Sequence, residues 1–268
     1  MDRIKTALEK NRVNRRKPAL EPVRTSRQES GEHPFEAIEY THSKRIDVMQ
    51  NVLAERRLIA GIRTDPRATA FRMLRTQVLH AMRENGWSLL GVTGPTSGIG
   101  KSLVATNLAI SISMEVNQTV LLVDADLRRP SIHKYFNFEP DQGLLDYLKG
   151  EASLSELFIN PVYKRLLLLP GRDTTTESSE LLSSPRMAHL IDDLRNRYDS
   201  RIIIFDLPPL LNVDDTMVLL PHLDATLMVV ENGKNTQSEV QNSMHLLQST
   251  NLIGTVLNKA DEEIRDYY

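Results

Sequence analysis

The chain has 268 residues and a near-neutral balance of 33 basic against 35 acidic side chains, with 40% hydrophobic and 25% charged residues. These proportions exclude a collagen-like, coiled-coil or wholly disordered chain, and the charge balance gives no sign of a nucleic-acid partner. The chain has no cysteine, which excludes disulfides, a thiol nucleophile and zinc sites built on thiolates. No apolar run approaches the roughly 20 residues that cross a bilayer, and the N-terminus lacks the apolar core of a signal peptide, so we expect a cytoplasmic protein.

The first 60 residues differ in composition from the rest. Residues 1–33 carry nine Lys or Arg residues against five acids and contain few apolar side chains. Pro18, Pro22 and Pro34 favour a linker over a long helix. We expect residues 1–60 to form a basic arm and linker, either a solvated tail or a docking segment for a partner or for membrane headgroups. Residues 61–268 are expected to form the main domain, ending in a short tyrosine tail.

The domain alternates helical and strand patterns. Apolar residues at helical spacing between Ala70 and Leu79 predict an amphipathic helix, and residues 102–115 predict another. Apolar runs predict six strands, at residues 88–92, 119–123, 165–169, 201–205, 225–230 and 252–257. Near-continuous apolar runs are typical of strands buried on both faces, so we expect an α/β fold with a mostly parallel central sheet flanked by helices.

The segment Gly94-Pro-Thr-Ser-Gly-Ile-Gly-Lys-Ser102 lies between a predicted strand and a predicted helix. It resembles a phosphate-binding loop, in which small residues let backbone N–H groups converge on phosphate oxygens, a lysine reaches the β and γ phosphates and a hydroxyl binds Mg²⁺. The first glycine stands at position 94, although the usual spacing requires it at position 95. The predicted nucleotide-binding residues here are Gly98, Ile99, Gly100, Lys101, Ser102 and Leu103.

Carboxylates follow two of the predicted strands. Asp124 and Asp126 follow residues 119–123, and Asp206 follows residues 201–205. Because carboxyl ends of parallel strands meet at one edge of a sheet, these acids are expected beside the phosphate loop. Asp124 and Asp126 would order Mg²⁺ or accept a hydroxyl proton, Arg128 would offset phosphate charge, and Ser102 with Asp124 and Asp206 would serve the metal.

Two further acidic or polar motifs have a more local interpretation. Asp214 and Asp215 are better suited to begin a helix than to catalyse. After the last predicted strand, Asn258 offers an amide to a nucleobase edge, and the segment Asn258-Lys-Ala-Asp261 also matches the pattern by which many GTPases read guanine. Asp206 is followed by Leu-Pro-Pro, and the Asp-x-x-Gly pattern of GTPases is absent, which favours adenine; a GTPase stays open as a third reading.

Together these motifs and their order resemble the bacterial tyrosine autokinases of capsule and exopolysaccharide biosynthesis, in the stand-alone, exosortase-associated form, within the Walker P-loop ATPase class. The resemblance rests on residues 71–77, on Lys101-Ser102, on Asp124 to Pro130 and on Asp206 to Pro209. It implies autophosphorylation on tyrosine with ATP and Mg²⁺, regulation of exopolysaccharide polymerisation or export, and ATPase activity. It further implies activation by a membrane polysaccharide co-polymerase, which would bring the chain to the inner membrane, and a possibility of homo-oligomers.

On the same resemblance, the catalytic residues are Lys101, Asp124, Asp126 and Arg128, and the phosphate acceptors are Tyr267 and Tyr268. The sequence departs from the family in two places. Thr69 stands where the family's oligomerisation motif has a glutamate, three residues before Arg72 in the pair Arg72 and Arg75, and two terminal tyrosines replace a larger cluster. These departures keep a second reading open, an ATP-dependent switch or scaffold of the same machinery without kinase activity.

Overall fold

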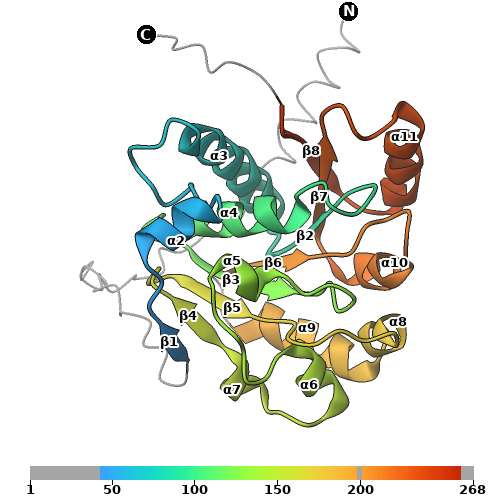
Figure 1. Ribbon diagram of the computed structural model, residues 1–268. Helices are drawn as coiled ribbons and strands as arrows, with labels where there is room; N and C mark the ends of the chain where they lie inside the picture. The colour runs from blue at the N-terminus through green and yellow to red at the C-terminus, as the bar shows by residue number, and fades with distance from the viewer. Residues whose placement is uncertain (1–42, 198–200, 261–268) are drawn as a thin grey trace, which may run out of the picture. The chain divides into compact units, whose positions relative to one another are not determined.

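A computed structural model describes residues 43–197 and 201–260. These residues belong to one compact unit, residues 40–268, whereas the unit made by residues 1–39 lies outside the described residues. The centre of the described unit is an eight-stranded sheet with the strand order β1-β4-β5-β3-β6-β2-β7-β8 (Figure 1). The strands are β1 (Lys44–Ile46), β2 (Leu89–Thr93), β3 (Thr119–Asp124), β4 (Ile159–Pro161), β5 (Leu166–Leu169), β6 (Arg201–Asp206), β7 (Ala225–Glu231) and β8 (Leu252–Asn258).

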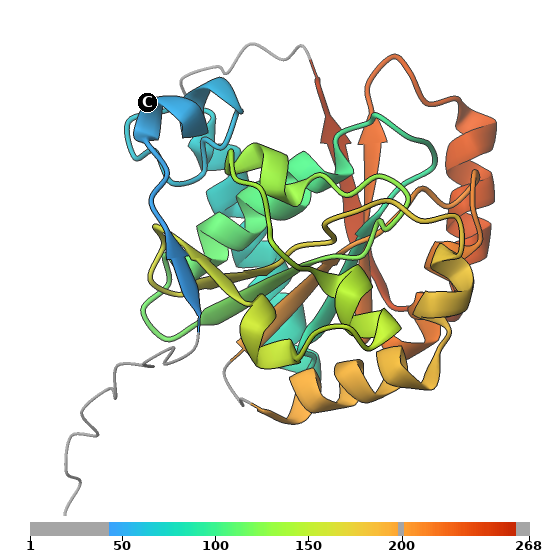
Figure 2. The same cartoon turned by 60° about the horizontal axis from the view of Figure 1, so that its bottom comes forward.

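The strands are parallel, apart from the antiparallel pair β4 and β5. The expected α/β fold with a mostly parallel sheet is therefore confirmed. All six strands predicted from apolar runs are present, with ends within one residue of those expected. The two strands that sequence reasoning missed, β1 and β4, have three residues each and lie beside each other at one end of the sheet (Figure 2).

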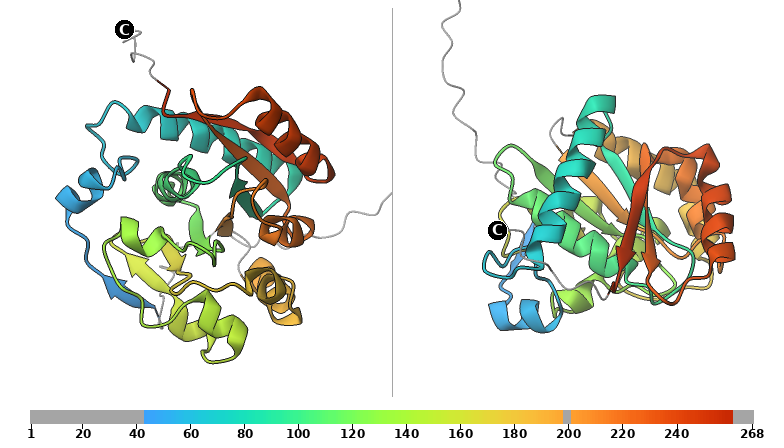
Figure 3. Two further views of the ribbon diagram at one scale, coloured as in Figure 1. Left: turned by 45° about the vertical axis from the view of Figure 1, so that its right-hand side comes forward. Right: turned by 90° about the horizontal axis from the view of Figure 1, so that it is seen from above.

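Helices cover both faces of the sheet (Figure 3). They are α2 (Gln50–Glu55), α3 (Ala68–Asn85), α4 (Lys101–Ser113), α5 (Ile132–Tyr135), α6 (Leu144–Lys149), α7 (Leu154–Leu157), α8 (Ser178–Leu182), α9 (Pro185–Arg197), α10 (Asp215–Leu219) and α11 (Gln237–Leu246), with two short 3₁₀ turns at Leu220–His222 and Leu247–Ser249. Among the described residues, no helix combines the length and the apolar character that crossing a bilayer requires.

The core consists of two apolar layers because successive strand residues point to opposite faces. In β3, Val120 and Leu122 pack into the layer under α3 and α4, whereas Leu121 and Val123 pack into the layer under α6 and α9. The other central strands alternate in the same way. Helix α4 lies almost wholly inside, with eleven buried residues out of its thirteen, so its N-terminus is held firmly at the carboxyl edge of the sheet.

The folded unit begins before residue 60. Strand β1 pairs with β4, and Leu53 and Leu58 lie in the core. Buried Asn107 on α4 holds the turn that follows α2. Its Oδ1 accepts a hydrogen bond from the Ala60 N–H at 3.0 Å, and its Nδ2 donates to the Arg57 carbonyl at 3.0 Å. Residues 44–60, which the sequence analysis grouped with the arm, thus belong to the folded unit: β1 joins the sheet, and residues 57–60 contact α4.

Candidate active site

The phosphate loop joins β2 to α4 and requires glycine at three positions. Gly98 and Gly100 have φ angles of 74° and 92°, in the left-handed region where a side chain is strained. Gly94 has another reason: a Cβ atom there would collide with the Val229 carbonyl oxygen on β7 and with the Ile99 side chain. The shifted glycine at position 94 is therefore explained by close approach of the loop to the neighbouring strand.

The loop offers unpaired N–H groups next to the start of α4. In the described part of the chain, no backbone hydrogen bond is donated by the N–H groups of Gly98, Ile99 or Gly100. Lys101 is the first residue of α4 and is 94% buried despite its charge, and Ser102 follows it half-buried. Free N–H groups, a helix N-terminus and an ammonium group at one place form an arrangement suited to phosphate.

Two fully buried carboxylates stand beside this loop at the ends of neighbouring strands. Asp124 and Asp206 are direct partners in the register of β3 and β6, and Val92 of β2 lies opposite Asp206 on the other side. Asp124 Oδ2 accepts hydrogen bonds from the N–H groups of Ser131 and Ile132 at 2.8 and 2.9 Å. Asp124 Oδ1 and both carboxylate oxygens of Asp206 lie buried without a well-formed hydrogen bond among the described residues, and the Ser102 hydroxyl is the side-chain donor that acts on Asp206.

Burial and mutual repulsion make these acids hard to ionise. Burial raises the pKa of Asp124 to about 7, and the Asp126 carboxylate adds to the effect. Burial likewise raises the pKa of Asp206 well above its usual value, with a contribution from Asp124, while the Lys101 ammonium opposes it. Burial also raises the pKa of Asp126, again against Lys101. Carboxylates whose pKa values burial raises together in this way are typical of functional sites that bind or transfer charged groups.

The unpaired oxygens fit a divalent cation that a nucleotide brings with it. Within the described ranges, no group of three or more His, Cys, Asp or Glu side chains is arranged to hold a metal ion by itself. Mg²⁺ usually keeps several waters and is bound by one or two protein groups together with substrate phosphates. Buried oxygens without partners on Asp124 and Asp206, beside Ser102, fit such a shared site.

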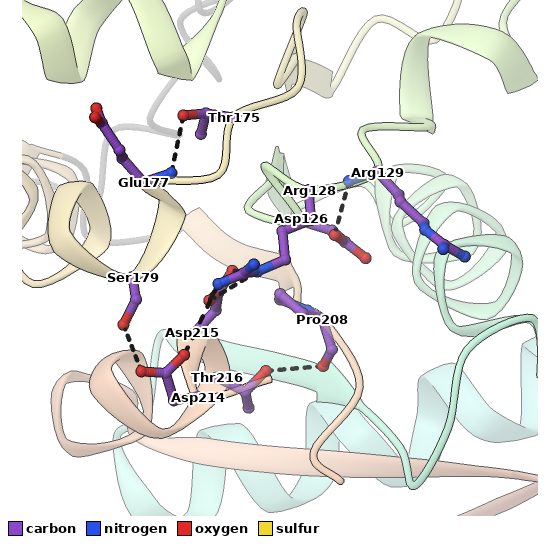
Figure 4. A network of polar contacts seen from close by, with 10 residues as sticks. All are labelled: Asp126, Arg128, Arg129, Thr175, Glu177, Ser179, Pro208, Asp214, Asp215 and Thr216. Carbon is purple, nitrogen blue, oxygen red and sulfur yellow. Dashed lines mark hydrogen bonds and ion pairs between the residues drawn. The ribbon is translucent and has the colours of Figure 1, made fainter. Parts of the chain in front are cut away.

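Arg128 lies in a polar network that the sequence did not predict (Figure 4). Its Nε and one terminal nitrogen donate to the buried Asp215 carboxylate at distances of 2.9 to 3.1 Å. Asp214 accepts from the Ser179 hydroxyl at 2.9 Å. Asp215 begins α10, as the sequence analysis predicted, and the network ties the end of β3 to α8 and α10. A contact between Arg128 and phosphate stays a prediction.

Asn258 contacts the phosphate loop directly. Its Nδ2 donates to the Ile99 carbonyl at 2.8 Å, and Lys259 Nζ donates to the Gly98 carbonyl at 3.2 Å. From the turn after β7, Lys234 Nζ donates to the Ser97 carbonyl at 3.1 Å and Asn235 Nδ2 to the Thr96 hydroxyl at 2.9 Å. A base contact by Asn258 stays a prediction, and its amide nitrogen serves the loop here.

Sequence reasoning missed Lys234 and Asn235. Their position in the turn after an apolar strand, at the carboxyl edge of the sheet, was the feature of the sequence that could have indicated a role in the site. The predicted acceptors Tyr267 and Tyr268 lie outside the described residues. The other predicted site residues meet at this edge: the loop residues, the head of α4 and the three acids.

Comparison with known proteins agrees with this geometry. Residues 91–260 match the model of a family described as an AAA domain. The chain is 35% identical over 229 residues to the "Putative tyrosine-protein kinase EpsB" of Ralstonia nicotianae, covering 83% of this chain and 30% of the relative. It is 34% identical over 203 residues to the tyrosine-protein kinase wzc of Salmonella typhi, covering 75% of this chain and 28% of that protein. This chain thus spans less than a third of the length of these relatives.

A solved structure of a tyrosine-kinase domain matches this chain over nearly the whole length of that domain. The kinase domain of the Escherichia coli tyrosine kinase ETK superposes with a TM-score of 0.71 at 30% identity, covering 84% of this chain and 91% of that one. From the matching family model, this alignment and the shared position of a phosphate loop among strand-end carboxylates, the chain belongs to the AAA-domain family of P-loop ATPases and, within it, to the bacterial tyrosine-kinase domains.

Proposed function

We propose that this protein is an ATP- and Mg²⁺-dependent tyrosine autokinase that regulates exopolysaccharide polymerisation or export. One observation carries the proposal: the fully buried carboxylates of Asp124 and Asp206 end neighbouring strands beside the phosphate loop, in a domain that is 30% identical to the kinase domain of the Escherichia coli tyrosine kinase ETK. Transfer of a phosphoryl group to a hydroxyl also needs a carboxylate in reach of the hydroxyl proton, and a buried aspartate beside the phosphate loop can supply one.

Different residues are assigned to the binding of ATP, to the acceptance of the proton and to the stabilisation of charge during phosphoryl transfer. The N–H groups of Gly98 to Gly100 and the Lys101 ammonium bind and orient the phosphates of ATP, with Leu103 on the first turn of α4 behind them. A tyrosine oxygen attacks the γ phosphorus, the bond to the bridging oxygen of ADP breaks, and the phenolic proton passes to Asp124. Lys101 stabilises the negative charge that the β and γ oxygens hold during transfer.

Ser102, Asp124 and Asp206 would hold Mg²⁺, with Asp126 acting through bound water. When bound, the ion neutralises charge on the β and γ phosphates and fixes their orientation. The raised pKa values of Asp206 and Asp126 are consistent with this role, because a nearby cation restores the charged form of each acid.

The acceptors are proposed to be Tyr267 and Tyr268, reached in trans from a second copy. A membrane polysaccharide co-polymerase is the proposed activator, so the protein would work at the cytoplasmic face of the inner membrane, with the basic segment of residues 1–33 as a candidate docking segment. The support is the likeness of this domain to the "Putative tyrosine-protein kinase EpsB" and to a "Putative tyrosine-protein kinase in cps region".

A second function, an ATP-dependent switch without kinase activity, is favoured by one observation on α3. Arg75, which the family resemblance assigns to subunit contacts, donates to the Ser111 carbonyl at 3.1 Å and pairs with Glu115 at 3.0 Å within the same chain. Arg72 donates to the Thr69 hydroxyl at 2.6 Å. Both arginines are therefore engaged internally, and an assembly that presents tails in trans would have to compete with these contacts.

Mass spectrometry separates the two functions. The purified protein is treated with phosphatase, incubated with Mg·ATP, and its phosphopeptides are mapped. We expect phosphate on Tyr267 or Tyr268 in the wild type and in Tyr147→Phe, a control whose ring lies under Arg186. We expect none in Lys101→Met and little in Tyr267→Phe with Tyr268→Phe. Hydrolysis of ATP without any phosphotyrosine, also with the co-polymerase present, would establish the switch, and preference for GTP would establish the third reading.

A further inference from the structure

The outer side of the phosphate loop is held by side chains from two turns that are distant in sequence. Four consecutive loop residues, 96 to 99, each accept one hydrogen bond, from Asn235, Lys234, Lys259 and Asn258 in that order. The first two donors follow β7 and the last two lie at and after the end of β8. Glu231 links the two lysines, with Nζ to carboxylate distances of 3.5 Å to Lys234 and 2.9 Å to Lys259.

Three of these bonds fall on successive peptide carbonyls. Lys234 binds the oxygen of Ser97, Lys259 that of Gly98 and Asn258 that of Ile99. In a trans peptide the carbonyl and the following N–H point in opposite directions, and no peptide bond here is cis. Donors on these three oxygens therefore leave the N–H groups of residues 98, 99 and 100 facing the other side.

Those N–H groups are the ones without a backbone partner in the described chain. A donor on a carbonyl also polarises the peptide and makes its N–H a stronger donor, by an estimated 10–30% per bond. Two of the three donors are ammonium groups, whose hydrogen bonds are stronger than neutral ones. Position 96 is threonine and the loop before Lys101 contains no basic residue, so the cations that serve its backbone come from outside it.

We propose that Lys234, Lys259 and Asn258 are positioning residues of the nucleotide site: they hold three consecutive carbonyls from behind and thereby aim and polarise three N–H groups toward the phosphates. The inference rests on the proposed function only in taking this loop as the nucleotide site. It assigns to Asn258 a role through the loop backbone. It makes phosphate affinity depend on Glu231, which keeps the two lysines together.

The test uses the full chain labelled with ¹⁵N and Mg·ADP as the probe. We expect Lys234→Met and Lys259→Met each to weaken Mg·ADP binding about tenfold by calorimetry, in line with the loss of one charge-assisted hydrogen bond. Arginine at either position should recover most of the affinity. Lys149→Met, at an exposed position at the end of α6, is the matched control and should bind like the wild type.

Amide chemical shifts distinguish orientation of single N–H groups by these side chains from stabilisation of the loop as a whole. Before nucleotide is added, Lys234→Met should shift the ¹⁵N resonance of Gly98 most, Lys259→Met that of Ile99, and Asn258→Ala that of Gly100. Wild-type affinity in both lysine variants, or a loss of affinity accompanied by diffuse shifts and lower thermal stability, would overturn the inference.

The proposed nucleotide site itself is checked with Lys101→Met. If the wild type does not bind Mg·ADP, or if Lys101→Met binds it equally well, the site is wrong and both proposals fall. If Lys101→Met loses binding while Lys234→Met and Lys259→Met keep it, only the positioning role falls. Absence of phosphotyrosine with normal Mg·ADP binding would remove the kinase and leave the positioning role standing.

Discussion

Replacing Asp124 by asparagine should make the nucleotide-free protein more stable and less active. The Asn carbonyl oxygen can still accept from the Ser131 and Ile132 N–H groups, which in the wild type bond to one carboxylate oxygen. The other oxygen, which has no partner in the described chain, becomes an amide near Asp206. The substitution thus removes a buried charge and keeps the two contacts that shape the turn before α5.

The size and sign of the effect follow from the pKa of Asp124. Burial raises it from 3.8 to about 7, so between pH 4 and pH 7 the folded chain retains a proton that the unfolded chain has lost. The free energy of unfolding therefore falls as the pH rises through this range. At about 1.4 kcal/mol per pKa unit the full effect is about 4 kcal/mol, and relaxation around the charge reduces this to an expected 2–4 kcal/mol.

Urea unfolding followed by fluorescence of Trp87, the single tryptophan, measures this difference without nucleotide. Asp124→Asn should gain about 2–4 kcal/mol over the wild type at pH 8 and no more than about 1 kcal/mol at pH 4.5. Asp192→Asn, at an exposed site on α9, is the control. An unchanged pH dependence in Asp124→Asn, or a variant less stable than the wild type at pH 8, would refute the argument from burial. Autophosphorylation should fall by about 10²- to 10⁴-fold through loss of the base.

Three other changes test other parts of the structure. Lys101→Met should abolish phosphoryl transfer and weaken Mg·ADP binding by at least about tenfold, as measured by calorimetry; transfer at the wild-type rate would exclude this loop as the site. Asn107→Ala removes the acceptor of the Ala60 N–H and should cost about 2–4 kcal/mol in urea unfolding, because buried backbone groups lose their partners; a cost below about 0.5 kcal/mol would show that the preceding turn is held by other contacts. Arg128→Ala leaves the Asp215 carboxylate buried without its cation. Since the arginine is one-third exposed, the free energy of unfolding should fall by about 1–3 kcal/mol, and adding Asp215→Asn should recover it. No recovery of stability in the double variant would contradict the pairing.

The sequence predicted the central strands because a strand that is buried on both faces has a near-continuous run of apolar residues. The apolar runs of β2, β3, β5, β6 and β7 mark their ends within one residue, and the run of the half-buried edge strand β8 does so as well. β1 and β4 show no apolar run that predicts a strand. Each has three residues, and their pairing depends on contacts between residues 44–46 and 159–161. No local pattern indicates that the chain returns to that edge.

The site was predictable where chemistry follows directly after a strand. Asp124 and Asp206 end adjacent strands, so the sheet brings them together without help from other residues. The Arg128–Asp215 pair and the contact of Lys234 with the loop were not predictable in this way. The ion pair depends on β3 lying beside β6, and the contact of Lys234 depends on β7 lying beside β2, although more than 130 residues separate these two strands.

That strand order also bears on how the protein is made. β2, which leads into the phosphate loop, pairs with β6 and β7 and with neither of the strands nearest to it in sequence. During synthesis at about 5–20 residues per second, β2 therefore waits several seconds for its neighbours to leave the ribosome. Pairings between distant segments form slowly because a long loop must close first. Nucleotide binding by nascent chains of increasing length would thus report the late stage of folding, and a chain released before β7 would expose an unpaired apolar strand to aggregation.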